Sequence, residues 1–423
     1  MDMIKNVPVL RFPEFSGDWE VKLYGEIYSF YSTNSLSRDK LNYDNENVKN
    51  IHYGDIHTKF NTMFNIKNEY VPFINSDVNL SKIKKESYCL NGDLVIADAS
   101  ENYDDIGKTM EIINLNDEKV IAGLHTFLAR PNNYDMALGY AGYLLQSWKV
   151  RKQIMTIAQG TKVLSLSTSR LAKINLNLPQ FKEQTKIANF LTQIDSKIGQ
   201  LSKKKQLLER YKKGVMQNIF SQALRFKDDN GNAYPDWEVK KLELIATFHR
   251  GGGLSKSDLD NKGSNECIHY GELFTLYNEV INIVNSKTNK NEGVKSKVGD
   301  ILMPSSDVTP QGLGKASVLM KSNVLLGGDI NIIRSNERIN SIFLSYLINY
   351  DKNKVIRLVT GTTVKHIYTK DLKVIVVNFP SSFKEQTKIA NFLTELDQKI
   401  NLVEKQLNGT KDYKKGLLQQ LFV

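Results

Sequence analysis

One twelve-residue sequence, FKEQTKIANFLT, occurs twice in this chain, at Phe181–Thr192 and again at Phe383–Thr394. Similarity continues beyond it, because both copies are followed by a YKKG sequence, at Tyr211–Gly214 and Tyr413–Gly416. Self-similarity over such a separation indicates an internal duplication. The chain is therefore expected to fold as one structural unit built twice.

The segment that opens with each copy has the pattern of a long helix. Apolar residues recur every seven positions with a second apolar residue between them, which is typical of a coiled-coil seam. The expected helix-pairing residues are Ile187, Leu191, Ile194, Ile198, Leu201 and Leu208 in the first copy and Ile389, Leu393, Leu396, Ile400, Val403 and Leu407 in the second. Lys205, Lys212, Thr410 and Lys414 interrupt the apolar series. The alternative is a helix packed only on its own domain, but the long, regular heptad pattern favours pairing.

Two such helices in one chain are expected to pair with each other. The region between them begins where the first helix ends and finishes where the second begins. Because a compact domain keeps its termini close together, the second helix should run antiparallel to the first.

Shorter repeats lie outside the helices and define the domain plan. DWEVK occurs at Asp18–Lys22 and Asp236–Lys240, and the sequence at Gly160–Pro179 parallels that at Gly361–Pro380. The predicted organisation is a globular domain over residues 1–180, a helix over 181–221, a second globular domain over 222–382 and a helix over 383–423. The predicted fold class is α+β, with two mixed α/β domains separated by an antiparallel coiled coil and related by an internal pseudo-twofold repeat.

Within the globular domains, apolar runs bounded by turn residues predict strands over Gly92–Ser100 and Gly299–Asp307. Helices are expected over Tyr143–Gly160 and Ile342–Gly361, with the terminal glycine of each as a C-cap. Closing strands are expected before Pro179 and Pro380.

The charge balance favours an anionic partner. The chain has 57 Lys plus Arg against 46 Asp plus Glu, a net charge of +11. Such a surplus suits nucleic acid or an anionic membrane, but no apolar run approaches the roughly 18 residues that span a bilayer. The N-terminus has no secretory h-region. Cys89 and Cys267 are isolated, which favours a reducing compartment, and a cytoplasmic location is expected.

Catalytic motifs are not found in the sequence. Ile106–Thr109 contains Gly-Lys-Thr, but Asn102 stands where a phosphate-binding P-loop requires glycine. The six histidines lack metal-ligand spacing. No catalytic or metal-ligating residue is predicted.

The remaining candidates are cations and hydroxyls beside glycine turns, which suit phosphate contacts, and arginines, which suit guanine. The predicted DNA-binding residues are Lys108, Arg130, Thr161, Lys162, Arg250, Lys315, Arg334, Thr362, Thr363 and Lys365. Taken singly, each residue of this kind is more often a solvated surface charge, but their recurrence at equivalent positions favours a contact.

The combination of these motifs resembles the specificity subunit of type I restriction-modification enzymes. The resemblance rests on VPVLRFPEFSGDWEVK at Val7–Lys22, the paired GD and GK sequences in both halves, and the doubled KEQTKIANFLT. It implies two target-recognition domains, each recognising one part of a split site in double-stranded DNA, and two helices that set the spacer and dock two methyltransferase subunits. S-adenosylmethionine would bind those partners, which methylate adenine, and ATP and Mg²⁺ would serve a restriction subunit. The specificity subunit itself would carry no cofactor and no chemistry.

Two other functions are compatible with parts of the sequence. The chain could itself be a methyltransferase or nuclease, although no residues for such chemistry are apparent. It could also be a coiled-coil adaptor whose basic charge only aids solubility. Binding to DNA that weakens steeply with salt would separate recognition from the adaptor function.

Overall fold

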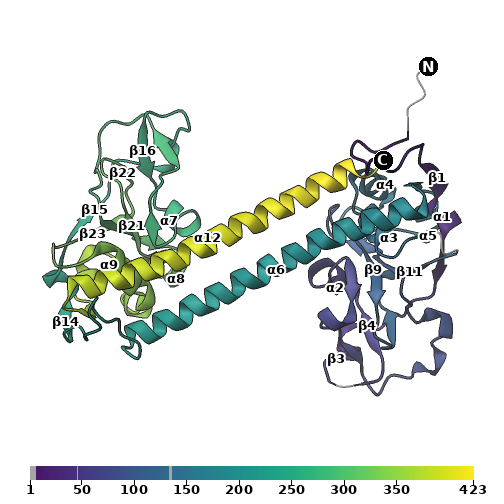
Figure 1. The fold of residues 1–423 in the computed structure, drawn as a ribbon, viewed down its shortest axis with the longest axis horizontal. Coiled ribbons are helices and arrows are strands. Elements are labelled where there is room, and N and C mark those ends of the chain that lie inside the picture. Colours follow the sequence, from purple (N-terminus) through teal and green to yellow (C-terminus); the bar gives the residue numbers. More distant parts are fainter. Residues whose placement is uncertain (1–5, 45, 133–135) are drawn as a thin grey trace. The chain divides into compact units, whose positions relative to one another are not determined.

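The computed structural model describes residues 6–44, 46–132 and 136–423 and divides into two compact units. Unit 1 comprises Met1–Ser202 with Lys405–Val423, and unit 2 comprises Lys203–Glu404. Each unit contains a mixed α/β domain, here called its head, together with parts of two long helices, α6 (Phe181–Phe220) and α12 (Phe383–Gln420) (Figure 1). The two units are described separately.

The head of unit 1 is built on a five-stranded sheet of order β2-β11-β7-β9-β5. All neighbours are antiparallel except β5 and β9, which are parallel. The strands are β2 (Tyr28–Tyr31), β5 (Met63–Asn65), β7 (Leu94–Ala97), β9 (Thr109–Asn114) and β11 (Thr126–Pro131). A four-stranded sheet contains β3 (Leu41–Asn42), β4 (Lys49–Ile51), β6 (Phe73–Ile74) and β10 (Val120–Ala122).

The head of unit 2 repeats this topology. Its five-stranded sheet has the order β15-β23-β19-β21-β17, again with only the last pair parallel. The strands are β15 (Ala246–Arg250), β17 (Val280–Ile281), β19 (Asp300–Pro304), β21 (Ser317–Leu319) and β23 (Ile330–Ser335). A three-stranded sheet contains β16 (Asn265–Ile268), β18 (Ser286–Thr288) and β22 (Leu325–Leu326). The predicted α+β class and internal repeat are confirmed.

In each head the strand that enters the domain pairs with the strand that closes it. In unit 1, β1 (Glu20–Leu23) pairs antiparallel with β13 (Asn175–Leu178). In unit 2, β14 (Trp237–Lys241) pairs in the same way with β25 (Val376–Pro380). The repeated DWEVK sequence therefore marks the entry strand, and the predicted closing strands are confirmed.

The helices that were predicted to end at glycine are each broken in two. Unit 1 has α3 (Tyr140–Leu144) and α4 (Trp148–Ile157), and unit 2 has α9 (Ser341–Tyr350) and α10 (Lys352–Ile356). Extended backbone at Ser147 and a non-helical Asp351 interrupt them. The prediction of continuous, glycine-capped helices was wrong, because apolar periodicity can continue across such a break.

The long helices run antiparallel within each unit. In unit 1, Asp195 of α6 pairs with Lys414 of α12, and Ile187 and Leu191 share a core with Leu417 and Leu421. In unit 2, Lys205 pairs with Glu404 and Lys212 pairs with Asp397. In both units, residue numbers rise along one helix as they fall along the other, which confirms the predicted direction. No helix in the described part of the chain is both long and apolar enough to cross a membrane.

Candidate nucleic-acid interface

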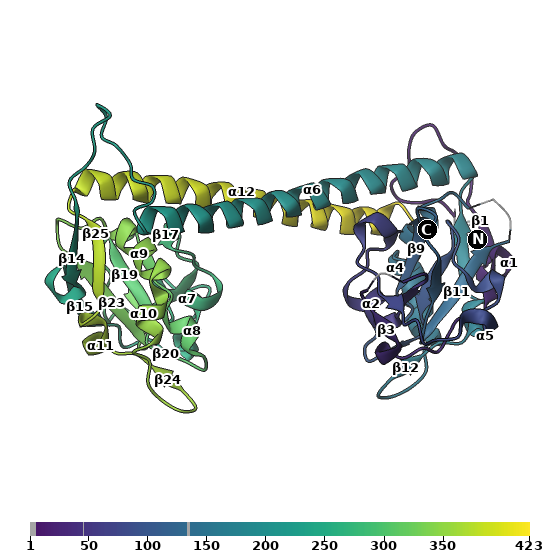
Figure 2. The same cartoon turned by 90° about the horizontal axis from the view of Figure 1, so that it is seen from below.

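Each head carries a short hairpin, here called its tip hairpin, at residues 159–165 in unit 1 and 360–366 in unit 2. Gln159 and Ser165 exchange two backbone hydrogen bonds of 3.0 and 2.7 Å. Thr360 and His366 exchange two of 3.0 and 2.8 Å. In each unit the strand that ends the hairpin, β12 (Leu164–Ser165) or β24 (Lys365–His366), lies on the side of the head opposite the long helices (Figure 2).

A left-handed glycine shapes each tip hairpin. Gly160 has φ +124° and Gly361 has φ +104°. A Cβ atom at these positions would lie 2.0 Å from the Val163 carbonyl oxygen and 2.1 Å from that of Val364. The two glycines therefore permit a tight turn that other residues cannot form, which is their role in place of the predicted helix cap.

The predicted residues Thr161, Lys162, Thr362 and Thr363 lie exposed at the hairpin tips. Within the described chain, their backbone N–H groups have no acceptor. Lys365 lies at the start of β24, where its ammonium donates to the Gly361 carbonyl at 2.7 Å. The tips thus present free amides and hydroxyls, the groups that contact phosphates.

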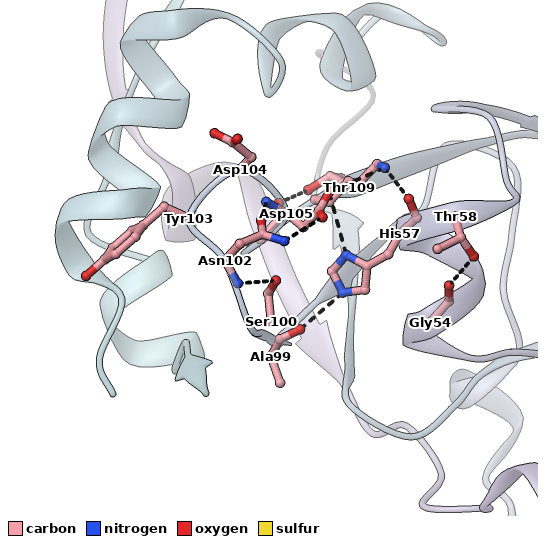
Figure 3. Close-up of polar contacts among 12 residues, drawn as sticks. Gly54, His57, Thr58, Ala99, Ser100, Asn102, Tyr103, Asp104, Asp105 and Thr109 are labelled. Atoms are coloured by element: carbon pink, nitrogen blue, oxygen red, sulfur yellow. Dashed lines mark hydrogen bonds and ion pairs between the residues drawn. The ribbon is translucent and has the colours of Figure 1, made fainter. Parts of the chain in front are cut away.

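A second predicted loop is brought beside the tip hairpin by strand pairing. In unit 1, β8 (Ala99–Ser100) pairs with β12, and Lys108 lies at the end of the loop that follows β8. The Lys108 ammonium donates to the His57 carbonyl at 2.6 Å and lies 3.6 Å from Asp105. The His57 ring lies between Asp105 of this loop and Ala99 of β8 (Figure 3). The charge of Lys108 is therefore partly compensated within the head.

The matching lysine of unit 2 has different surroundings. There β20 (Ser306–Asp307) pairs with β24, and Lys315 follows α8 (Pro310–Leu313). Lys315 is half-buried and lines a cleft of about 1050 Å³ beside Lys212 and Lys213 of α6. Burial lowers the pKa of Lys315, although Glu279 opposes the shift.

Two of the predicted arginines are bound within their own heads. The Arg130 guanidinium forms bonds of 2.8 and 2.7 Å to Asp93, and Arg334 forms bonds of 2.7 and 3.1 Å to Asp300. The two aspartates are buried and belong to the repeated GD sequences. Bidentate pairs of this kind tie neighbouring strands together. The third arginine, Arg250, is exposed and lies 3.1 Å from Asp329.

A further set of cations lies outside the residues predicted from the sequence. Residues 148–173, from α4 through α5 (Thr168–Leu171), contain Lys or Arg at 149, 151, 152, 162, 170 and 173 and no Asp or Glu. Lys149, Lys152, Lys162 and Lys173 have no carboxylate partner among the described residues. A groove of about 280 Å³ lies between Lys152, Arg170 and Lys173. The long run without acidic residues is the sequence signal that could have identified this surface.

Unit 2 also carries exposed cations on α10, directly after it, and on α11 (Thr369–Lys373). Lys352, Arg357 and Lys373 are exposed and have no carboxylate partner within the described chain. Each tip hairpin is therefore flanked in sequence by helices that carry unpaired positive charge, although the individual positions differ.

The identical twelve residues hold each long helix on its own head. Glu183 is buried and accepts two bonds, of 2.8 and 2.7 Å, from Arg11. Glu385 is buried and accepts two, of 3.2 and 2.9 Å, from Arg225. Both arginines come from the repeated LRF sequence. Much of the repetition is thus explained by internal docking.

The predicted helix-pairing residues face inward. All are buried except Ile198 and Leu208, which are half-buried. Ile187, Leu191 and Ile194 pack into the core of head 1, and Ile389, Leu393 and Leu396 pack into the core of head 2. The first turns of each seam therefore contact a head as well as the other helix.

Two of the lysines that interrupt the heptads form a matched cluster. In unit 1, Lys414 lies 2.7 Å from Asp195, which accepts a hydrogen bond of 2.8 Å from Tyr143 of the head. In unit 2, Lys212 lies 2.6 Å from Asp397, which accepts one of 2.6 Å from Tyr346. Each lysine also lies 5.2 Å from the ring centre of that tyrosine. The polar residues thus join both helices to the head.

The described residues contain no group of three or more His, Cys, Asp or Glu that could hold a metal ion. The two cysteines are buried and unpaired, and burial raises the pKa of Cys267 to about 11.

Comparisons with known proteins agree with this arrangement. The family model described as "Type I restriction modification DNA specificity domain" matches residues 16–210 and 234–410. A putative type I restriction enzyme specificity subunit, MjaX, of Methanocaldococcus jannaschii is 26% identical over 99% of this chain and 96% of its own length. The MjaVIII specificity subunit of the same organism is 26% identical over 66% of this chain and 68% of its own.

Solved structures show the same fold. The specificity subunit of a type I restriction-modification system from M. genitalium superposes with a TM-score of 0.63 and 15% identity, covering 99% of both chains. A chain from a study of complex assembly in a type I system has a TM-score of 0.53 and 15% identity, covering 95% of this chain and 96% of that one. Since the family model matches each half of the sequence separately, this chain belongs to the type I restriction-modification DNA specificity family and is a specificity subunit with two target-recognition domains.

Proposed function

We propose that each head recognises one half of a bipartite DNA site and that the chain performs no chemistry of its own. The observation that carries this proposal is the repeated tip hairpin, which has the same backbone in both heads but different side chains. Unpaired cations flank both copies, and DNA binding depends on neutralising phosphates. Two heads with different side chains can recognise unlike half-sites.

Among the predicted contacts, the residues at the hairpin tips are the best placed to bind DNA. Thr161, Lys162, Thr362 and Thr363 are exposed. Arg130 and Arg334 would first have to leave buried carboxylates, which favours a structural role for that pair. The unpaired lysines of residues 148–173 would add phosphate contacts.

The long helices are proposed to set the spacer and to dock two methyltransferase subunits. These partners would bind S-adenosylmethionine and methylate adenine, and a restriction subunit would use ATP and Mg²⁺. The proposal is supported by family membership and by a structural neighbour that comes from a study of complex assembly. Part of each repeat, including Lys182 and Asn189 with their counterparts Lys384 and Asn391, is exposed and available to a partner.

The test is the salt dependence of DNA binding by the complex with its methyltransferase. Replacing Lys149, Lys152 and Lys173 together by Gln should reduce the slope of log K against log salt by about 2.7, since each phosphate contact contributes about 0.9. A control complex with Lys67, Lys82 and Lys85 replaced by Gln has the same net charge and should keep the wild-type slope. Equal slopes in both variants would contradict the proposed surface. Binding without any sequence preference would leave only the adaptor function.

A further inference from the structure

Each tip hairpin exposes a valine at the same place. Val163 is 55% exposed and Val364 is 44% exposed, and each is the fourth residue of a Gly-Thr-x-Val sequence. In unit 1, Leu164 directly after the valine and Leu166 just beyond the hairpin are both buried. The hairpin thus separates residues that anchor it in the head from a valine that the head does not cover.

These valines are held in position by the backbone. The paired bonds between Gln159 and Ser165, and between Thr360 and His366, close each hairpin at its base. The left-handed glycine then fixes the turn, since a Cβ atom there would clash with the valine carbonyl. An apolar side chain fixed in this way loses little conformational freedom when a partner covers it.

The surrounding charge indicates what that partner is. In unit 1 the valine follows Lys162. Helix α4 before the hairpin carries Lys149 and Lys152, and the turn after α5 carries Lys173; these lysines have no carboxylate partners in the described chain. The partner must therefore be strongly anionic and yet offer apolar surface to a small side chain. A DNA groove meets both requirements, because its walls are phosphates and its floor exposes thymine methyl groups and base edges.

We propose that the tip hairpins enter the DNA groove and that Val163 and Val364 contact the apolar part of a base there. This inference rests on the proposed function and extends it to the element that recognises sequence. Because the valine occurs in both heads, it serves a contact that the two half-sites have in common. The differing neighbours would then distinguish one half-site from the other.

Those neighbours differ in chemistry on one shared backbone. Lys162 of unit 1 corresponds to Thr363 of unit 2, and Ser165 corresponds to His366. In unit 2 the His366 ring stacks on Tyr368 at 5.9 Å between ring centres, whereas unit 1 has Ser167 at the matching position. Unit 1 therefore offers the Lys162 ammonium where unit 2 offers the Thr363 hydroxyl, and unit 2 adds an aromatic pair that unit 1 lacks.

The experiment compares Val163→Ala and Val364→Ala in the complex with its methyltransferase. Matched controls are Val21→Ala and Val239→Ala, which alter valines that are 55% and 65% exposed on the entry strands. Removing two methyl groups from an apolar contact should weaken binding to the specific site about tenfold. Each tip variant should relax the preference at one half-site only, whereas binding to non-specific DNA and the control variants should match the wild type.

Three results would overturn the inference. Tip variants that bind the specific site like the controls would show that the valines make no contact. Equal losses on specific and non-specific DNA would show that they do not contact bases. A wild-type complex with no preferred sequence would refute the proposed function as well, which distinguishes that failure from the first two. Giving unit 1 three of the differing residues of unit 2, by Lys162→Thr with Ser165→His and Ser167→Tyr, should change the preference of half-site 1 alone.

Discussion

The Lys212 cluster offers a quantitative test of how unit 2 is held together. Lys212 occupies a seam position that the heptad pattern would fill with an apolar residue, and it is 12% exposed. Burial opposes its charge, but Glu279 and Asp397 outweigh burial and hold the pKa of Lys212 above its ordinary value. Lys212→Met would remove the charge, keep the length and leave Asp397, which is 17% exposed, without its ion pair.

The expected cost follows from burial. Removing one partner of a fully buried pair costs about 3–5 kcal/mol, and the partial exposure of both groups reduces this to about 2 kcal/mol. Lys205→Met is the control, because Lys205 and Glu404 are 25% and 44% exposed. A pair exposed to that degree contributes about 0–1 kcal/mol.

The assay is urea unfolding followed by the fluorescence of Trp237. That residue lies in unit 2, and Trp19→Phe with Trp148→Phe removes the tryptophans of unit 1. Lys212→Met and Asp397→Asn, made singly and together, should give a coupling energy of about 1–2 kcal/mol. A coupling below about 0.5 kcal/mol, or equal losses in Lys212→Met and Lys205→Met, would refute the claim that this cluster joins the helices to the head.

Three further predictions follow from buried or strained positions. Burial raises the pKa of Glu111 from 4.5 to about 7, although two backbone N–H donors favour the charged form. Since the carboxyl ionises more easily in the unfolded chain, unit 1 should lose about 3 kcal/mol of stability as the pH rises from 4.5 to 7. Glu111→Gln should abolish this pH dependence in unfolding measurements. Gly160→Ala should distort its hairpin and weaken binding at one half-site at least tenfold in titrations, with the melting temperature of the head little changed. Arg225→Met should leave Glu385 buried without a cation and destabilise unit 2 by about 3 kcal/mol in urea unfolding, whereas an unchanged midpoint would contradict the docking role of the repeat.

The duplication made the architecture predictable from the sequence. Identical residues in two places required two equivalent units, and the heptads predicted the helices that begin at Phe181 and Phe383. The antiparallel direction followed from connectivity, because the second head joins the end of one helix to the start of the other. The break at Ser147 could not be predicted, since apolar residues continue on both sides of it.

Individual side-chain environments were harder to predict than the fold. Arg130 and Lys108 are cations beside loops in the sequence, but whether a cation is free depends on carboxylates distant along the chain, such as Asp93 for Arg130. A residue can also be repeated in both halves for either of two reasons, internal packing or contact with a partner, and the sequence alone does not separate them. Glu183 is repeated because it accepts from Arg11 inside the head, whereas Val163 is repeated and remains exposed.

Adenine-methylation mapping of a host genome tests the central claim most directly, with wild-type chain and with residues 160–179 replaced by those of another specificity subunit. The wild-type chain should give one bipartite motif with two unlike halves. The replacement should change one half of that motif and leave the other half and the spacer unchanged. A motif without two separated halves, or a replacement that changes both halves together, would contradict recognition of one half-site by each head.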